Sequence, residues 1–130
     1  MRYMLDTDSV SYALRGHGNV ATRLLQETPS AVCVSSLSVA ELRFGAHKRG
    51  SRKLGRLIDT FLASITVQPF DEAAANVYGR LAAQLLKRGQ PIGQVDALLA
   101  AHAISLGLTM VTNNDRHFGK VPGLTIENWV

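Results

Sequence analysis

The chain has 130 residues, a single cysteine, and 14 Lys and Arg against 10 Asp and Glu, which gives a formal net charge of +4 at pH 7. This length predicts one domain, 1–130, whose core is large enough to fold without a disulfide scaffold. The N-terminus lacks the pattern of a signal peptide and no apolar run reaches membrane-spanning length, so we expect a soluble cytoplasmic protein. Cys33 lies within an apolar run, which fits a small buried side chain in a reducing compartment.

Short apolar runs alternate with helical patterns along the chain, without an internal repeat or a linker. The clearest helical pattern lies at 54–62, where apolar residues recur every three or four positions. In chain order, the predicted elements are a strand at 3–5, helices ending near 14 and covering 19–28, a strand at 31–34, helices at 37–50 and 54–62, a strand at 66–67, helices at 73–88 and 95–108, and strands at 109–112 and 124–126. This alternation predicts an α/β fold with a mainly parallel sheet.

Two polar segments follow predicted strands, at the edge where parallel sheets place their sites. Asp6, Thr7 and Asp8 come directly after the first strand. Asp115 follows the strand that ends at Thr112. Each acid also has a structural interpretation, because Asp6 is a favourable helix N-cap, Asp8 complements a helix dipole and Asp115 suits a turn.

Two further acids lie in helices with apolar surroundings. Glu41 comes three residues after Ser38, which predicts a capping box if Ser38 begins the helix, although Ser35 and Ser36 are alternative caps. Asp96 opens the most apolar helix of the chain, where a carboxylate withdrawn from water needs a proton, hydrogen bonds or a cation. Stabilisation of the helix dipole explains the position of Asp96 but not its apolar neighbours.

Together, these acids predict a cation site built from oxygen ligands. Carboxylates brought close together cannot all ionise at neutral pH unless a cation neutralises them. Oxygen donors suit Mg²⁺ or Mn²⁺, and the chain has no Cys/His cluster with the spacing of a zinc site. The histidines are scattered, and we expect each to be structural or superficial: His17, His47, His102 and His117.

Basic residues gather between Glu41 and Asp59, with no acid among them. A surface of this kind attracts polyanions through its long-range potential and the release of counterions. Alternatively, the run is a solvated helix face, in which Lys48 and Arg49 complement a helix C-terminus before Gly50. The cations of this run include Arg43, Arg49, Arg52 and Lys53.

Several short motifs occur in an order that resembles a known family. They are Leu5-Asp6-Thr7, Ala40-Glu41-Leu42, Pro91-Ile92-Gly93-Gln94-Val95-Asp96 running into Ala100-Ala101-His102-Ala103, Val111-Thr112-Asn113-Asn114, Phe118, Val121-Pro122-Gly123-Leu124 and the closing Glu127-Asn128-Trp129. In this order the sequence is similar to the PIN-domain ribonucleases and, within them, to the VapC toxins of bacterial VapBC toxin–antitoxin pairs. The likeness covers nearly the whole chain.

The resemblance implies a PIN-like three-layer α/β/α domain with an acidic pocket at the C-terminal edge of its sheet. It assigns Asp6, Glu41 and Asp96 to catalysis, with Asp6 and Asp96 as metal ligands. Polar side chains that orient ligands or hold water are implied at Thr7, Thr112 and Asn113.

The fourth acid of the family is where this chain departs from many relatives. They often place an acid directly before the residue equivalent to Phe118, and this chain has His117 there. Others place it three residues before that Phe, which assigns the fourth catalytic place to Asp115.

The function implied by the resemblance is that of an endoribonuclease dependent on Mg²⁺ or Mn²⁺, which hydrolyses a phosphodiester bond of a structured RNA such as tRNA or rRNA. Such proteins usually act as homodimers, and a cognate VapB-like antitoxin inhibits them. Arg43, Arg49, Arg52 and Lys53 then become candidate contacts to the RNA or the antitoxin.

Two other interpretations stay open. Asp6 and Asp8 after an apolar strand match the start of haloacid-dehalogenase-type phosphatases, where the first Asp is a nucleophile. No pair of late aspartates follows, and 130 residues leave little room for that core. The second is a non-catalytic module of the same fold that binds RNA or a protein partner, which His117 in the fourth acidic place leaves open.

Overall fold

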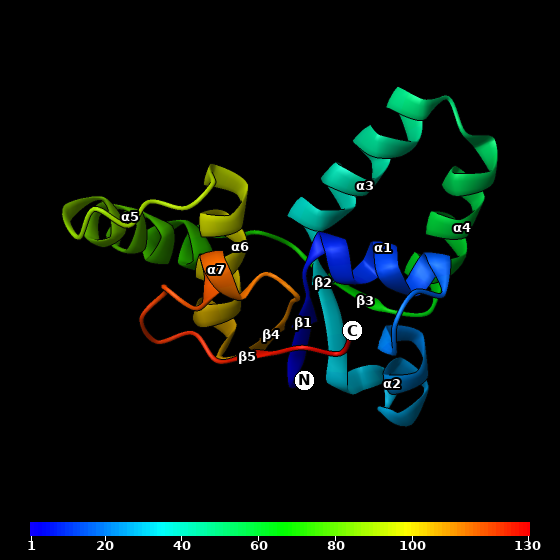
Figure 1. The fold of residues 1–130 in the computed structure, drawn as a ribbon, viewed down its shortest axis with the longest axis horizontal. Helices are drawn as coiled ribbons and strands as arrows, with labels where there is room; N and C mark the ends of the chain where they lie inside the picture. Colours follow the sequence, from blue (N-terminus) through cyan, green and yellow to red (C-terminus); the bar gives the residue numbers. More distant parts are fainter.

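A parallel sheet of five strands forms the centre of the computed structural model, which describes residues 1–130 (Figure 1). The strands lie in the order β3-β2-β1-β4-β5, and every neighbouring pair is parallel. Their bounds are β1 Tyr3–Leu5, β2 Val32–Ser35, β3 Thr66–Gln68, β4 Thr109–Val111 and β5 Ile126–Glu127. The helices are α1 Thr7–Arg15, α2 Val20–Gln26, α3 Ser36–Arg49, α4 Arg52–Ala63, α5 Glu72–Lys87, α6 Gln94–Leu106 and α7 Asp115–Phe118, with a 3₁₀ turn at Pro29–Ala31.

The predicted α/β fold with helices on both sides of the sheet is confirmed. In Figure 1, α5, α6 and α7 lie on one side of the strands, and α1 to α4 lie on the other. Most element boundaries shift by one or two residues. The helix α7 was not predicted, because it has only four residues and carries no apolar repeat. No helix in the structure combines the length and the apolar character needed to cross a membrane.

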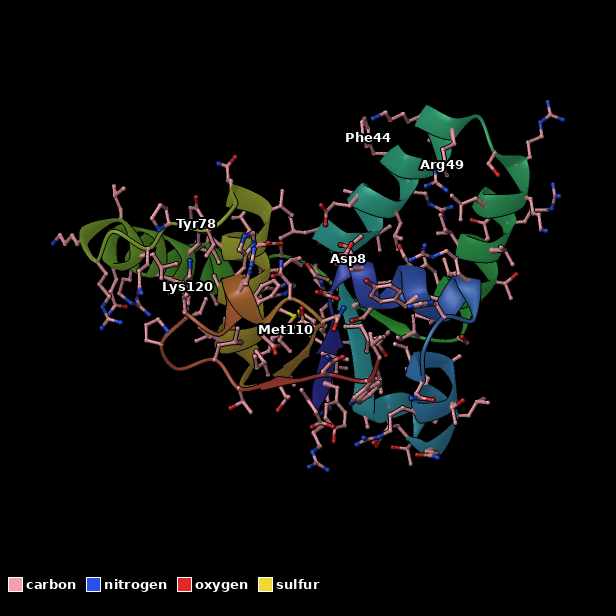
Figure 2. All side chains as sticks on the ribbon, in the orientation of Figure 1. Asp8, Phe44, Arg49, Tyr78, Met110 and Lys120 are labelled. Carbon is pink, nitrogen blue, oxygen red and sulfur yellow. The ribbon has the colours of Figure 1, made fainter.

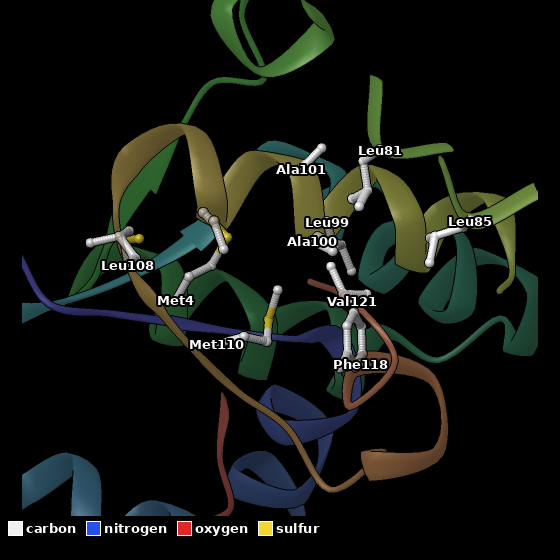
Figure 3. Close-up of a cluster of buried hydrophobic side chains, with 12 residues drawn as sticks. Met4, Leu81, Leu85, Leu99, Ala100, Ala101, Leu108, Met110, Phe118 and Val121 are labelled. Atoms are coloured by element: carbon white, nitrogen blue, oxygen red, sulfur yellow. The ribbon is translucent and has the colours of Figure 1, made fainter. Parts of the chain in front are cut away.

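Alternation along the strands divides the interior into two clusters of buried side chains. Met4 pairs in register with Cys33 and Met110, and all three belong to the cluster under α5 and α6 (Figure 3). Tyr3 and Leu5 belong to the cluster on the α1 to α4 side. Since successive strand residues face opposite sides, both faces of a sheet whose central strand reads Tyr-Met-Leu must be covered.

The helix α6 is packed into the middle of the first cluster. Leu99, Ala100, Ala101 and Ala103 are all buried, and α5 packs alongside. Cys33 lies in the same cluster, where burial raises the pKa of its thiol to about 12. The thiol is therefore protonated at neutral pH and acts as a small apolar side chain, as the sequence predicted.

His102 joins α6 to the ends of two strands. Its Nδ1 lies 2.8 Å from Oγ of Ser35, the last residue of β2, and its ring stacks edge-on against Phe70 at 5.3 Å. The ring is buried, which lowers its pKa, while Asp71 and the Pro69 carbonyl act in the opposite direction. The prediction that His102 is structural therefore agrees with its place between the sheet and α6.

Shortening Leu99 to Ala should lower the free energy of unfolding by about 2–5 kcal/mol, because the removed atoms leave a cavity in a packed core. Leu106, near the end of the same helix, is 40% exposed. Leu106→Ala should change the stability by no more than about 0.5 kcal/mol. Urea unfolding of the two variants checks the pair, and equal losses would contradict the assignment of Leu99 to the core.

Stability should fall as the pH drops below about 6.5, the ordinary pKa of histidine, because unfolding lets His102 take up a proton that the buried ring resists. Replacing His102 with Gln removes this proton uptake. The difference in unfolding free energy between wild type and His102→Gln should therefore shrink on acidification. Denaturant unfolding at several pH values from 7.5 to 5 checks this, and a difference independent of pH would contradict it.

Candidate active site

Asp6 lies at the carboxyl end of the central strand. Its backbone N–H donates to the Val111 carbonyl at 3.0 Å, and its side chain accepts a 2.8 Å hydrogen bond from the Ser9 backbone N–H. Asp6 is therefore the N-cap of α1, as its position predicted. A cap does not exclude a catalytic role, because the same carboxylate faces the sheet edge where sites form.

Burial has the largest effect on the pKa of the Asp6 carboxyl. The residue is only 4% exposed, and this raises the pKa of its carboxyl, while hydrogen bonds from Thr112 and Ser9 lower it and nearby Asp8 raises it further. None of the ion pairs in the structure involves Asp6. A buried carboxylate without a cationic partner is costly, and a bound cation would remove that cost.

Glu41 reaches the same strand end from α3. The N-cap of this helix is Ser35, whose hydroxyl accepts from the Leu37 N–H at 3.0 Å, so the capping-box interpretation based on Ser38 is wrong. The Thr7 hydroxyl, one residue beyond Asp6, donates to Glu41 Oε1 and lies 3.0 Å from Ser38 Oγ. Thr7 therefore ties the start of α1 to the first two turns of α3.

Asp96 lies in the first turn of α6, where Gly93 is the N-cap and supplies no side chain. Its side chain is 30% exposed, so the predicted partial withdrawal from water is present. Its Oδ2 lies 2.7 Å from Nδ1 of His117, in α7. This contact was not predicted. In the sequence, the only indication was that His117 comes directly before Phe118. In the structure Phe118 is buried, and this fixes the position of α7.

The segment after β4 connects these groups. Thr112 is buried, donates to Asp6, and accepts from the Asn114 N–H at 2.9 Å. Asn114 in turn caps α7 by accepting from the His117 N–H at 3.3 Å. The Asn113 side chain is exposed and accepts from Asn128 at 2.8 Å.

The predicted acids thus differ in how the structure places them. Thr112, Asn114 and His117 link Asp6 to Asp96. Glu41 contacts Thr7, the residue after Asp6. Asp115, the first residue of α7, is exposed. Its assignment to the fourth acidic place stays a prediction.

The donor set suits a hard divalent cation, because the acids offer only oxygen atoms and one of them is buried without a countercharge. The carboxylates are nevertheless separate: no three His, Cys, Asp or Glu side chains lie within reach of a single ion. Glu41 contacts Thr7, and Asp96 contacts His117. Glu41 is exposed, and Asp96 is half-buried.

A cleft of about 290 Å³ begins at this edge, between α1, α3 and α4. Thr7, Asp8 and Glu41 line its acidic end, and Arg15 and Arg49 line the other. Figure 2 shows Asp8 at the start of α1 and Arg49 on the outer part of α3. The cleft therefore has acids next to the sheet and cations about eight residues further along each helix, a distance of roughly 12 Å.

The other cations of the basic run lie around the α3–α4 turn. Arg52 and Lys53 are exposed in the first turn of α4, where positive charge is unfavourable next to the helix dipole. Arg43 forms a 2.6 Å ion pair with Asp59 across the two helices. Arg49, Arg52 and Lys53 are thus free to meet an anion, whereas Arg43 already has one.

The fold and this edge define a class: a parallel α/β domain with acidic side chains at the carboxyl edge of its sheet. Comparison with known proteins places the chain in that class, because residues 3–124 match the PIN domain family. The chain is 38% identical over its full length to Ribonuclease VapC2 of Haemophilus influenzae, covering 99% of that protein. It is 34% identical, over 99% of its own length and 98% of the other's, to a tRNA(fMet)-specific endonuclease VapC of Salmonella typhimurium.

Solved structures agree with the sequence relatives. DNA-bound VapBC from Salmonella typhimurium aligns with a TM-score of 0.91 at 34% identity, covering 100% of this chain and 99% of that one. VapBC2 from Rickettsia felis, bound to a DNA fragment from its promoter, gives 0.89 at 34% identity with both chains fully covered. The chain belongs to the PIN-domain family, among the VapC ribonucleases. Nucleases of this family depend on a divalent metal ion.

Replacing Asp6 with Asn should stabilise the protein in EDTA at neutral pH, because it removes a buried charge and keeps a good N-cap. The raised pKa gives the sign: above the ordinary value of 3.8 the folded carboxyl holds its proton longer than the unfolded one, so stability falls as pH rises through the folded pKa. Asp6→Asn should lack this fall. Thermal unfolding from pH 4 to 8 measures it.

Asp8→Asn is the matched control, since Asp8 is exposed in the first turn of the same helix. Losing its favourable interaction with the helix dipole should lower the stability by about 0.3–1 kcal/mol. Opposite signs for the two variants would support the buried-charge argument. Destabilisation by both would contradict it.

Proposed function

We propose that this chain is an Mg²⁺- or Mn²⁺-dependent endoribonuclease toxin that hydrolyses a phosphodiester bond of a structured RNA, with tRNA as the first substrate to test. The relatives support this proposal, since one of them is named for cleavage of tRNA(fMet). We also propose that residues 1–130 act as one PIN-like domain, in the cytoplasm, where such an RNA is found.

The observation that carries the proposal is the buried carboxylate of Asp6 at the centre of the sheet edge. It lacks a cationic partner, and Thr112, Asn114 and His117 link it to Asp96. The next residue, Thr7, contacts Glu41. Burying a carboxylate destabilises the fold. A buried carboxylate at a sheet edge therefore indicates a functional site.

Asp6 and Asp96 are the residues that would hold the ion, with Glu41 beside them. When bound, such an ion polarises a phosphate and makes a bound water more acidic. Glu41 is exposed at the mouth of the cleft, where it can accept a proton or orient a water. Asp115 is the other candidate for this task. Thr7, Thr112 and Asn113 would keep the carboxylates and nearby waters in place.

The cations at the far end of the cleft could bind RNA phosphates on either side of the cleaved bond. Arg15 and Arg49 line the cleft itself, and Arg52 and Lys53 extend the positive surface over the α3–α4 turn. Contacts of this kind bind phosphates regardless of sequence and weaken with salt. Arg43 is a weaker candidate because it is paired with Asp59.

The partners follow from the solved relatives, which are VapBC complexes. We propose that a VapB-like antitoxin inhibits this chain and that the chain forms a homodimer. Of the two rival interpretations, the phosphatase falls with membership of the PIN-domain family. The non-catalytic binding module is decided by the experiment below.

Purified protein should cut total bacterial RNA, or isolated tRNA, into discrete fragments in Mg²⁺ or Mn²⁺, and EDTA should abolish the cleavage. Asp96→Asn should lower the rate by roughly two orders of magnitude or more, since several kcal/mol of charge stabilisation depends on the ion. Denaturing gels with end-mapped fragments provide the measurement.

Glu72→Gln is the matched control, because Glu72 is an exposed acid in the first turn of α5, on the other side of the sheet from Glu41. It should cut like the wild type. Cleavage that survives EDTA or Asp96→Asn would place the reaction elsewhere. Folded, antitoxin-free protein that cuts nothing with either ion would support the binding module instead.

A further inference from the structure

His117 makes the one side-chain hydrogen bond that Asp96 has in the structure. Its Nδ1 lies 2.7 Å from Asp96 Oδ2, across 21 residues of chain, and the two side chains are 42% and 30% exposed. This distance lies within the range of charge-assisted hydrogen bonds. The contact occupies one oxygen of Asp96 and leaves Oδ1 for other partners.

The chemistry of the pair decides which ring nitrogen carries hydrogen. A carboxylate only accepts hydrogen bonds, so the nitrogen facing Oδ2 must be an N–H donor. His117 therefore donates through Nδ1. The other nitrogen, Nε2, has no hydrogen-bond partner within the chain and takes no part in holding Asp96.

The donor is held in place from both sides. Asn114 caps α7 at the His117 N–H, and Thr112 holds Asn114 while also donating to Asp6. After His117, the Phe118 side chain is buried in the core under α5 and α6 (Figure 3). A side chain at Gly119 would lie 2.5 Å from the Asp115 carbonyl oxygen, so only glycine allows this tight turn.

We propose that His117 is a positioning residue for Asp96: its Nδ1–H fixes the Asp96 carboxylate so that the free oxygen serves the cation. Because Thr112 and His117 belong to one short segment, the same segment orients both Asp6 and Asp96. The inference rests on the proposed function, and it gives a role to the residue directly before Phe118. Such partners of a ligand set its orientation and affinity without touching the ion.

The test uses two amides that each reproduce one ring nitrogen. In Asn the amide nitrogen is bonded to Cγ, as Nδ1 is, whereas in Gln it lies one bond further out, near the place of Nε2. His117→Asn should therefore keep the contact with Asp96, and His117→Gln should lose it. His117 is half exposed, so both variants should fold, which thermal unfolding in EDTA verifies.

The readout is the affinity for Mn²⁺ alone, measured by electron paramagnetic resonance of the free ion and by calorimetry. His117→Gln and His117→Ala should bind Mn²⁺ about 10–100-fold more weakly than wild type, and His117→Asn should stay within about threefold. Activity on RNA need not be measured, so the result does not depend on the identity of the substrate.

The outcomes distinguish a failure of the His117 role from a failure of the proposed metal-dependent function. Retention by Gln with loss by Asn would overturn the proposal that the Nδ1–H positions Asp96. Equal loss by both amides would also overturn it, because the ring itself would then be required. Unchanged affinity in every variant would remove His117 from the site. Wild type that binds no Mn²⁺ would overturn the metal site and, with it, the inference.

Discussion

The position of β1 in the middle of the parallel sheet is the constraint on which the rest of the structure depends. Because β2 and β4 pair with β1 in the same direction, the three strands end at one edge. Ser35, Asp6 and Thr112 follow from that pairing as neighbours of the edge, and α3 and α7 begin just beyond it. Glu41 and Asp96 come from other parts of the chain, and they contact Thr7 and His117, which follow the ends of β1 and β4.

The same constraint lowers the stability of the fold, because it buries a carboxylate at the sheet edge. A central strand in a sheet covered on both faces leaves its last residue little access to water, which is why Asp6 is nearly fully buried and its carboxyl pKa is raised. The surrounding hydrogen bonds from Ser9 and Thr112 offset only part of that cost. Under the proposed function, a cation bound at Asp6 would couple the stability of the fold to the chemistry of the site.

The three acids near the edge differ in how firmly their side chains are held. Asp6 is fixed by its role as a helix cap, Asp96 is held by one donor from α7, and Glu41 projects from an exposed helix face. The cations lie further out along the cleft, beyond the acids. Under the proposed function, this order would keep Asp6 and Asp96 in place while Glu41 adjusts to an ion and to an RNA phosphate.

The sequence by itself determined the alternation of elements, the parallel α/β fold, the apolar nature of α6 and the candidates Asp6, Glu41 and Asp96. These features depend on residue order and periodicity, which are local. Only the tertiary structure decided that Ser35 rather than Ser38 caps α3, that Arg43 is paired with Asp59, and that His117 contacts Asp96. The Ser35 cap is a local choice among three neighbouring serines. The other two contacts join different helices, and they depend on distances between elements that no local pattern encodes.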